Sequence, residues 1–128
     1  MKTLATFLAV AGGGAIGASL RHAVQIAATR AFGYSFPTGT LAVNVAGCFA
    51  MGLVVAWFAA REPNPGPLRA FLAVGVLGGF TTFSAFALDA VTLWRDKALA
   101  VAALYVCGSV VLSVGGLMAG LAVGRSLW

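Results

Sequence analysis

Long apolar stretches alternate along the chain with short polar or breaker-rich segments. Four stretches carry no charged side chain, and they cover residues 3–20, 38–60, 70–88 and 98–124. A helix of about 18 to 20 apolar residues crosses the hydrocarbon core of a membrane, so each stretch predicts a spanning helix. Helices are expected because hydrocarbon offers no partner to the backbone groups of an open strand. The pattern predicts one all-α integral membrane domain over 1–128, with helices at about 3–31, 38–61, 69–94 and 98–125.

The segments between these helices are short and lie at 33–37, 62–67 and 95–97. Short links make sequential helices antiparallel neighbours. A removable signal peptide is the alternative for the first stretch, because Lys2 precedes an apolar run that ends in small residues. The three further stretches that follow are themselves long enough to span, which favours a retained helix.

Composition agrees with a membrane protein and excludes several other classes. The chain is 61% hydrophobic and only 9% charged, whereas a soluble domain has roughly a quarter charged residues. Its net charge of +5 comes from basic residues beside the helix ends, where they anchor membrane segments, so no nucleic-acid partner is expected. Cys48 and Cys107 lie within apolar helices and are expected to be small packing residues rather than a disulfide or metal site.

Basic residues are divided equally between the two predicted ends of the bundle. The end with the termini has Lys2, Arg61, Arg69 and Arg125, and the other end has Arg21, Arg30, Arg95 and Lys97. Such a balance removes the excess of positive charge that normally fixes orientation. It is what a chain needs if it inserts in both orientations and pairs as an antiparallel dimer. The alternative is an orientation set by the first loop or by an unknown partner.

The acidic residues are few and lie outside the predicted mid-membrane segments. They are Glu62, Asp89 and Asp96. A small multidrug exporter, which also has four helices, would need a carboxylate within the membrane, and helices one and two have none. No set of nucleophile, base or metal ligands predicts an enzyme. A purely structural subunit of an unknown complex is the remaining alternative.

Neutral hydrogen-bond donors are the polar groups inside the predicted helices. Thr40 and Asn44 lie one turn apart, and a stripe spaced by four follows at Tyr105, Ser109 and Ser113. Amide and hydroxyl donors can replace the water shell of an anion without a fixed charge, and the positive edges of phenylalanine rings can do so more weakly. The alternative for each serine or threonine is a hydrogen bond to a carbonyl of its own helix.

The segment at 78–86 contains two glycines followed by two threonines, a composition that weakens a helix. A helix broken in mid-membrane has carbonyls that must be buried or bind something, and these could hold a small hard cation. A kink satisfied by neighbouring hydroxyls is the alternative. Glycines spaced by four also occur at 13/17, 75/79 and 116/120/124. They predict close helix packing, within one subunit or between two.

Three of these segments together resemble the Fluc (CrcB-like) family of fluoride channels. The matching patterns are GGxxGAxxR at 13–21, GTLxVNxxG at 39–47 and GGxTTFSxF at 78–86. The resemblance covers essentially the whole chain, and its third pattern is the most specific. His22, Phe80 and Asp89 depart from the residues usual in that family.

The resemblance implies a passive, multi-pass fluoride channel of the bacterial inner membrane, built as a dual-topology antiparallel homodimer with helix three broken. A fluoride path would be lined by Asn44, Phe83 and Phe86, with polar contacts from Thr40, Thr82, Ser84, Tyr105, Ser109 and Ser113. Arg21 would draw anions into a vestibule. The backbone carbonyls of Gly78 and Thr81 from both subunits would hold a structural sodium ion. The implied partners are fluoride, a second copy of the chain and the lipid bilayer.

Overall fold

A computed structural model describes residues 2–61 and 66–128 of the chain. It has four helical stretches long and apolar enough to cross a membrane, at Thr3–Phe32, Thr38–Arg61, Pro67–Asp96 and Leu99–Leu127. The prediction of an all-helical chain with four candidate spans is therefore confirmed. Residues 62–65 of the predicted turn at 62–67, which include Glu62, lie outside the described part. The side chain of Lys2 also lies outside it.

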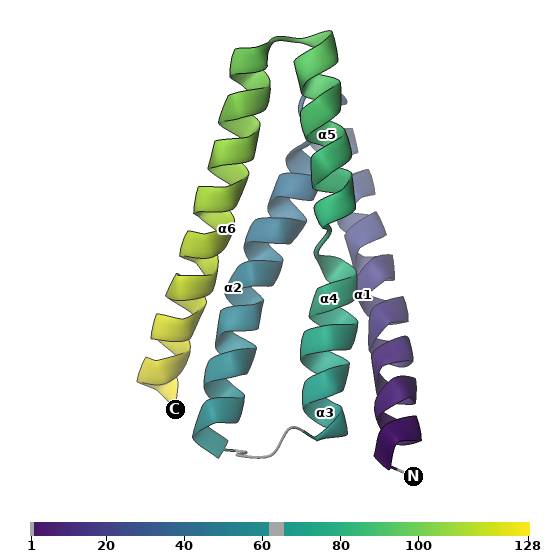
Figure 1. The fold of residues 1–128 in the computed structure, drawn as a ribbon, viewed down its shortest axis with the longest axis vertical. Coiled ribbons are helices and arrows are strands. Elements are labelled where there is room, and N and C mark those ends of the chain that lie inside the picture. The colour runs from purple at the N-terminus through teal and green to yellow at the C-terminus, as the bar shows by residue number, and fades with distance from the viewer. Residues whose placement is uncertain (1, 62–65) are drawn as a thin grey trace.

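Three of the spans are single helices, α1 (Lys2–Phe32), α2 (Thr38–Arg61) and α6 (Leu99–Leu127). The helices run alternately up and down, and both termini lie at the same end of the molecule (Figure 1). The most extensive helix pairs are α2 with α6 and α1 with the first half of the third span. α1 ends at Phe32 and is followed by Gly33, whose positive φ of 76° and N–H bond to the Thr29 carbonyl (2.8 Å) form a glycine C-cap.

The third span consists of several elements. It begins with α3 (Pro67–Arg69) and continues as the π-helical segment η1 (Ala70–Leu77) and the short α4 (Gly78–Phe80). Proline suits a first helical turn, where its missing N–H has no partner to lose. The N–H of Gly78 reaches back to the carbonyl of Ala73, which keeps the wider π-helical spacing. A single continuous α-helix over 69–94 is therefore not what this sequence forms.

Helical geometry stops at Thr81 and Thr82 and resumes in α5 (Phe83–Asp96), as Figure 1 shows between α4 and α5. Thr81 has φ −78° and ψ 157°, and Thr82 has φ −152° and ψ 121°, both extended. The Thr82 hydroxyl accepts a hydrogen bond from the N–H of Ala85 (3.2 Å). Threonine is a favoured N-cap, so Thr82 starts a new helix at the place where the paired glycines weaken the old one.

Glycines join α1 to the first half of the third span. A Cβ added at Gly13 would lie 2.5 Å from the Phe71 carbonyl oxygen, and one at Gly79 would lie 2.8 Å from the Gly14 carbonyl oxygen. A Cβ at Gly17 would collide with the carbonyl of Val76. The two backbones are thus in direct contact, which only residues without a side chain allow.

The pair α2 and α6 is joined in the same way. A Cβ added at Gly52 would lie 2.6 Å from the backbone nitrogen of Leu121, and one at Gly120 would collide with the carbonyl of Phe49. The glycine ladders predicted from the sequence pack helices within one subunit. The question left open by the spacing is settled for these positions, and the outer faces of the helices remain free for lipid or a partner.

Candidate functional site

A groove of about 290 Å³ lies between α2, the interruption of the third span, α5 and α6. Six of the nine side chains predicted for an anion path line it: Asn44, Thr82, Phe83, Phe86, Ser109 and Ser113. The other lining residues are Cys48, Thr81, Val110 and Val114, so none of the groove's lining side chains is charged. Residues far apart in sequence thus come together at the interruption.

Asn44 fastens the interrupted backbone. Its Nδ2 donates to the Thr82 carbonyl (3.0 Å), and its Oδ1 accepts from the Thr82 N–H (2.8 Å). One side-chain amide therefore satisfies both backbone groups of a residue that has no helical partners. An amide has two N–H donors, so one N–H of Asn44 remains for another acceptor. The sequence predicts Asn44 as an anion donor but does not reveal its bond to the backbone, because nothing local pairs residue 44 with residue 82.

Ser109 lines the groove and has a buried, unpartnered side-chain hydroxyl. Its side chain is only 4% exposed, and its Oγ has no hydrogen-bond partner among the described residues. A buried hydroxyl without a partner costs about 1–3 kcal/mol, which makes such groups rare in proteins and candidates for a ligand. Ser113, one turn further along α6, also lines the groove. The alternative of a bond to the helix's own carbonyl does not hold for Ser109.

Three aromatic rings form a row beside these hydroxyls. The ring centroids of Phe83 and Phe86 are 5.4 Å apart, and those of Phe86 and Tyr105 are 5.5 Å apart. Phe83 is 79% exposed and lies at the open side of the groove, whereas Tyr105 is 1% exposed. The row thus runs from the surface of the subunit into its interior.

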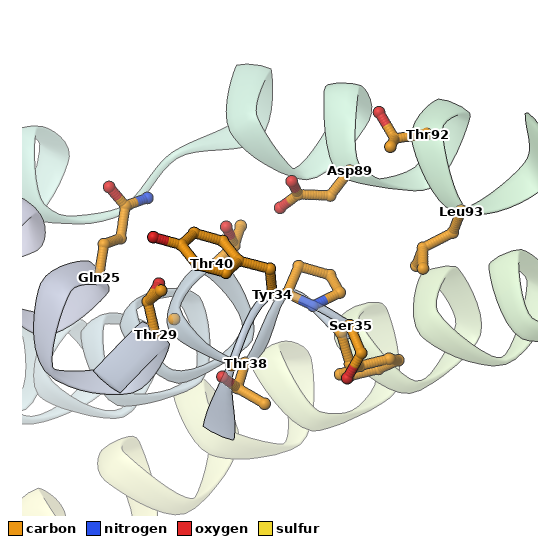
Figure 2. A pocket seen from close by; sticks show the side chains of 13 residues that line it. Gln25, Thr29, Tyr34, Ser35, Thr38, Thr40, Asp89, Thr92 and Leu93 are labelled. Carbon is orange, nitrogen blue, oxygen red and sulfur yellow. The ribbon is translucent and has the colours of Figure 1, made fainter. Parts of the chain in front are cut away.

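Tyr105, which packs against Phe86 of the groove, bonds to an acid that lies outside the groove. Its hydroxyl donates to Oδ2 of Asp89 (3.3 Å). Asp89 lies in the middle of α5 (Phe83–Asp96), towards the end of the third span. It lines a second pocket of about 320 Å³ with Thr40, Gln25, Thr29 and other polar residues. Figure 2 shows Gln25, Tyr34, Thr40 and Asp89 around this space.

Two further predicted residues lie outside both cavities. Ser84 is exposed, and its hydroxyl is 3.4 Å from that of Thr82. Arg21 is half-buried, and its Nη1 donates to the Thr81 carbonyl at 3.4 Å. Thr81 lies close to the midpoint of Pro67–Asp96. Arg21 is therefore at the depth of the interruption. Without it, the ends of the bundle have Lys2, Arg61, Arg69 and Arg125 against Arg30, Arg95 and Lys97.

The carbonyls of Gly78 and Thr81 have both lost their helical donors. The Thr82 N–H, four residues after Gly78, donates to Asn44, and the Ala85 N–H, four after Thr81, donates to the Thr82 hydroxyl. Gly78 is exposed on the single subunit. Carbonyl oxygens are ligands for hard cations, and each has two lone pairs, so the Arg21 bond leaves Thr81 one free. These two oxygens fit a sodium ion in their chemistry.

Comparison with known proteins identifies close relatives. Residues 8–121 match the family described as "CrcB-like protein, Camphor Resistance (CrcB)". The chain is 55% identical over 123 residues to a protein of Paracoccus denitrificans, covering 96% of this chain and 97% of the relative. It is 50% identical to a protein of Nitrobacter hamburgensis, with 94% and 98% covered, and 50% identical to one of Methylobacterium nodulans, with 98% and 97% covered. The first and third relatives carry the name fluoride-specific ion channel FluC, and the second is named fluoride-specific ion channel FluC 2.

Proposed function

The chain belongs to the CrcB-like protein family, and from this membership we propose that it is a fluoride-specific ion channel. It is a multi-pass membrane protein with four candidate spans, and we place it in a bacterial inner membrane. The family is one of channels and not of enzymes. Fluoride that enters the cell as neutral HF from an acidic medium ionises in the cytoplasm. The channel then lets the anion leave passively, down its electrochemical gradient.

The unpartnered Ser109 hydroxyl in an uncharged groove is the observation that carries the assignment of the path. Fluoride must exchange its water shell for other donors, and hydroxyl and amide groups supply them without a fixed positive charge that would trap the ion. Ser109, Ser113 and the remaining N–H of Asn44 are the donors of the groove. The edges of the Phe83 and Phe86 rings add weaker positive potential along the same side.

The remaining predicted residues act around this path. Thr82 and Ser84 hold the start of α5 through adjacent hydroxyls. Thr40 and Tyr105 supply further polar groups between the groove and the second pocket, which Thr40 and Asp89 line. Arg21 contributes positive potential at the depth of the interruption while bound to the Thr81 carbonyl. In this proposal Arg21 attracts anions from within the bundle rather than from a helix end.

The working unit that we propose is an antiparallel, dual-topology homodimer with the interruption of the third span at mid-membrane. The exposed ring of Phe83 and the open side of the groove leave room for a second copy to complete the path. The internal glycine ladders leave outer helix faces free for that contact. Basic residues are divided almost evenly between the two ends, four against three once Arg21 is counted within the bundle, and this supports insertion in both orientations.

Gly78 and Thr81 would hold the structural sodium ion of this dimer through their backbone carbonyls. Both carbonyls lack helical donors. The ion would neutralise the partial negative charge that these oxygens concentrate near the subunit contact. Asn44 keeps the carbonyls available by holding the extended backbone in place.

Efflux from liposomes that contain the purified protein tests the proposed function. The liposomes are loaded with fluoride or chloride, and each ion is read with its own electrode. We expect rapid fluoride efflux without chloride efflux. Equal efflux of both ions would leave an anion pore but contradict fluoride specificity, and no efflux from folded protein would contradict a channel.

A further inference from the structure

The side chain of Cys48 lines the same groove as Ser109, the residue with the unpartnered hydroxyl. Cys48 follows Asn44 by one helical turn on α2, so both lie on the same face of that helix. It is half-buried and forms part of the groove wall, across from Ser109 and Ser113 on α6. Its place in an apolar helix predicts a small packing residue. In the structure Cys48 also lines the groove.

A cysteine alone does not define a site, and here an independent observation marks the same space for a ligand. Ser109 is only 4% exposed as a residue, and its buried Oγ has no partner among the described residues. It lines the same groove as the Cys48 side chain. A ligand that reaches the Ser109 hydroxyl through this groove therefore passes the Cys48 side chain.

We propose that Cys48 is a covalent modification site inside the anion route, at which a small neutral thiol-specific electrophile closes the channel. The inference rests on the proposed fluoride conduction through this groove. With a methanethiosulfonate, the Cys48 sulfur attacks the sulfenyl sulfur of the reagent and forms a disulfide. The bond to the sulfonyl sulfur breaks, methanesulfinate leaves with the electron pair, and the thiol proton passes to the buffer.

Two physical effects follow from the adduct. The weak S–H donor is lost from the wall, and an S–CH₃ group occupies space in a groove of about 290 Å³ that must also admit the ion. Because a water molecule takes up about 30 Å³ in the liquid, a methylthio group displaces on the order of two waters. A benzylthio group displaces several more, so the block should grow with the size of the adduct.

Cys107 is the matched control. It lies on α6, is exposed, and is not among the residues that line the groove. The two thiols are the only cysteines of the sequence, so single substitutions separate them. The experiment uses the full chain, Cys48→Ala and Cys107→Ala in liposomes, each treated with methyl or benzyl methanethiosulfonate. Fluoride efflux is compared with the untreated rate of the same variant, and mass spectrometry measures the modification of each thiol.

We expect efflux of the full chain and of Cys107→Ala to fall at least tenfold, more with the benzyl reagent, and to recover with a reducing thiol. Cys48→Ala should keep its own untreated rate. Full modification of Cys48 with unchanged efflux would overturn the inference, as would an unreactive Cys48 beside a reactive Cys107. Absence of efflux from untreated full chain would instead contradict the proposed function itself, so the two failures are distinguishable.

Discussion

The two halves of the third span differ in how they are held and in what they present. The first half, η1 and α4, packs through glycines directly against the backbone of α1, and its side chains are apolar. The second half, α5, contributes Phe83 and Phe86 to the groove and Asp89 to the neighbouring pocket. The first half is fixed by backbone contact. The second half is held by polar groups at its start and by the packing of Leu93 against α6 further along.

The interruption between these halves explains the difference. Thr81 and Thr82 are extended, so α5 starts as a separate helix with its own N-cap. Its position depends on the Asn44 amide and the Arg21 guanidinium, which bond to the backbone of Thr82 and Thr81. The first half thus holds the span against α1 through its glycines, and the second half provides side chains that line the two cavities. Substitutions can therefore disrupt the packing of one half without changing the polar contacts of the other.

The largest effect on fluoride efflux is expected from Asn44→Asp, at the polar contacts that hold the start of α5. A carboxylate would face the Thr82 carbonyl in place of an N–H donor, and it would put a negative charge on the anion route. Together these effects should lower fluoride efflux by at least about 100-fold, equivalent to roughly 3 kcal/mol. Electrode-monitored efflux gives the rate, and the elution volume in gel filtration checks that assembly is unchanged. Normal efflux would remove Asn44 from the path.

Gly13→Val should lower the free energy of unfolding, because Gly13 lies where α1 packs directly against the first half of the third span. The added atoms would overlap the Phe71 carbonyl, and overpacking of this kind costs about 1–3 kcal/mol. Thermal unfolding in detergent measures the loss. Gly12→Val is the matched control, because a Cβ at Gly12 meets nothing within 4 Å. Equal unfolding temperatures for the two variants would refute the direct backbone contact between α1 and η1.

Ser109→Ala separates function from stability at the groove. The hydroxyl has no partner to lose, so the unfolding temperature should stay the same or rise. Fluoride efflux should fall about tenfold, because the ion loses one hydrogen-bond donor that stabilises it by roughly 1.5 kcal/mol. Ser19→Ala is the control: its hydroxyl bonds to the Ala15 carbonyl on an exposed face. A clear loss of stability in Ser109→Ala would indicate a structural hydroxyl instead.

The smallest effect is expected from Arg21→Gln. The bond from Arg21 to the Thr81 carbonyl is long, 3.4 Å, so its loss should cost about 1 kcal/mol in detergent unfolding. The exposed Arg30, on the same helix, provides the control Arg30→Gln. Identical unfolding of both variants would show that the guanidinium contributes nothing to holding the interruption.

Much of the site was accessible to sequence reasoning, with specific omissions. The pattern at 78–86 and the hydroxyls at 109 and 113 led to residues that line one groove. The spacing of the serines gave the side of α6 but not which hydroxyl lacks a partner. The charge count placed Arg21 at a helix end, because a position along the chain does not reveal how far a long side chain reaches.

By itself, the sequence determined the four candidate spans, the lack of a carboxylate in α1 and α2 and the weak helix at 78–82, because hydrophobicity and helix propensity are properties of local segments. Only the tertiary structure decided that the glycine ladders pack within the subunit, that Asn44 binds Thr82, and that Tyr105 binds Asp89. These outcomes depend on which helices lie side by side and at what height. That arrangement is fixed by the sum of many weak packing contacts and not by any one segment.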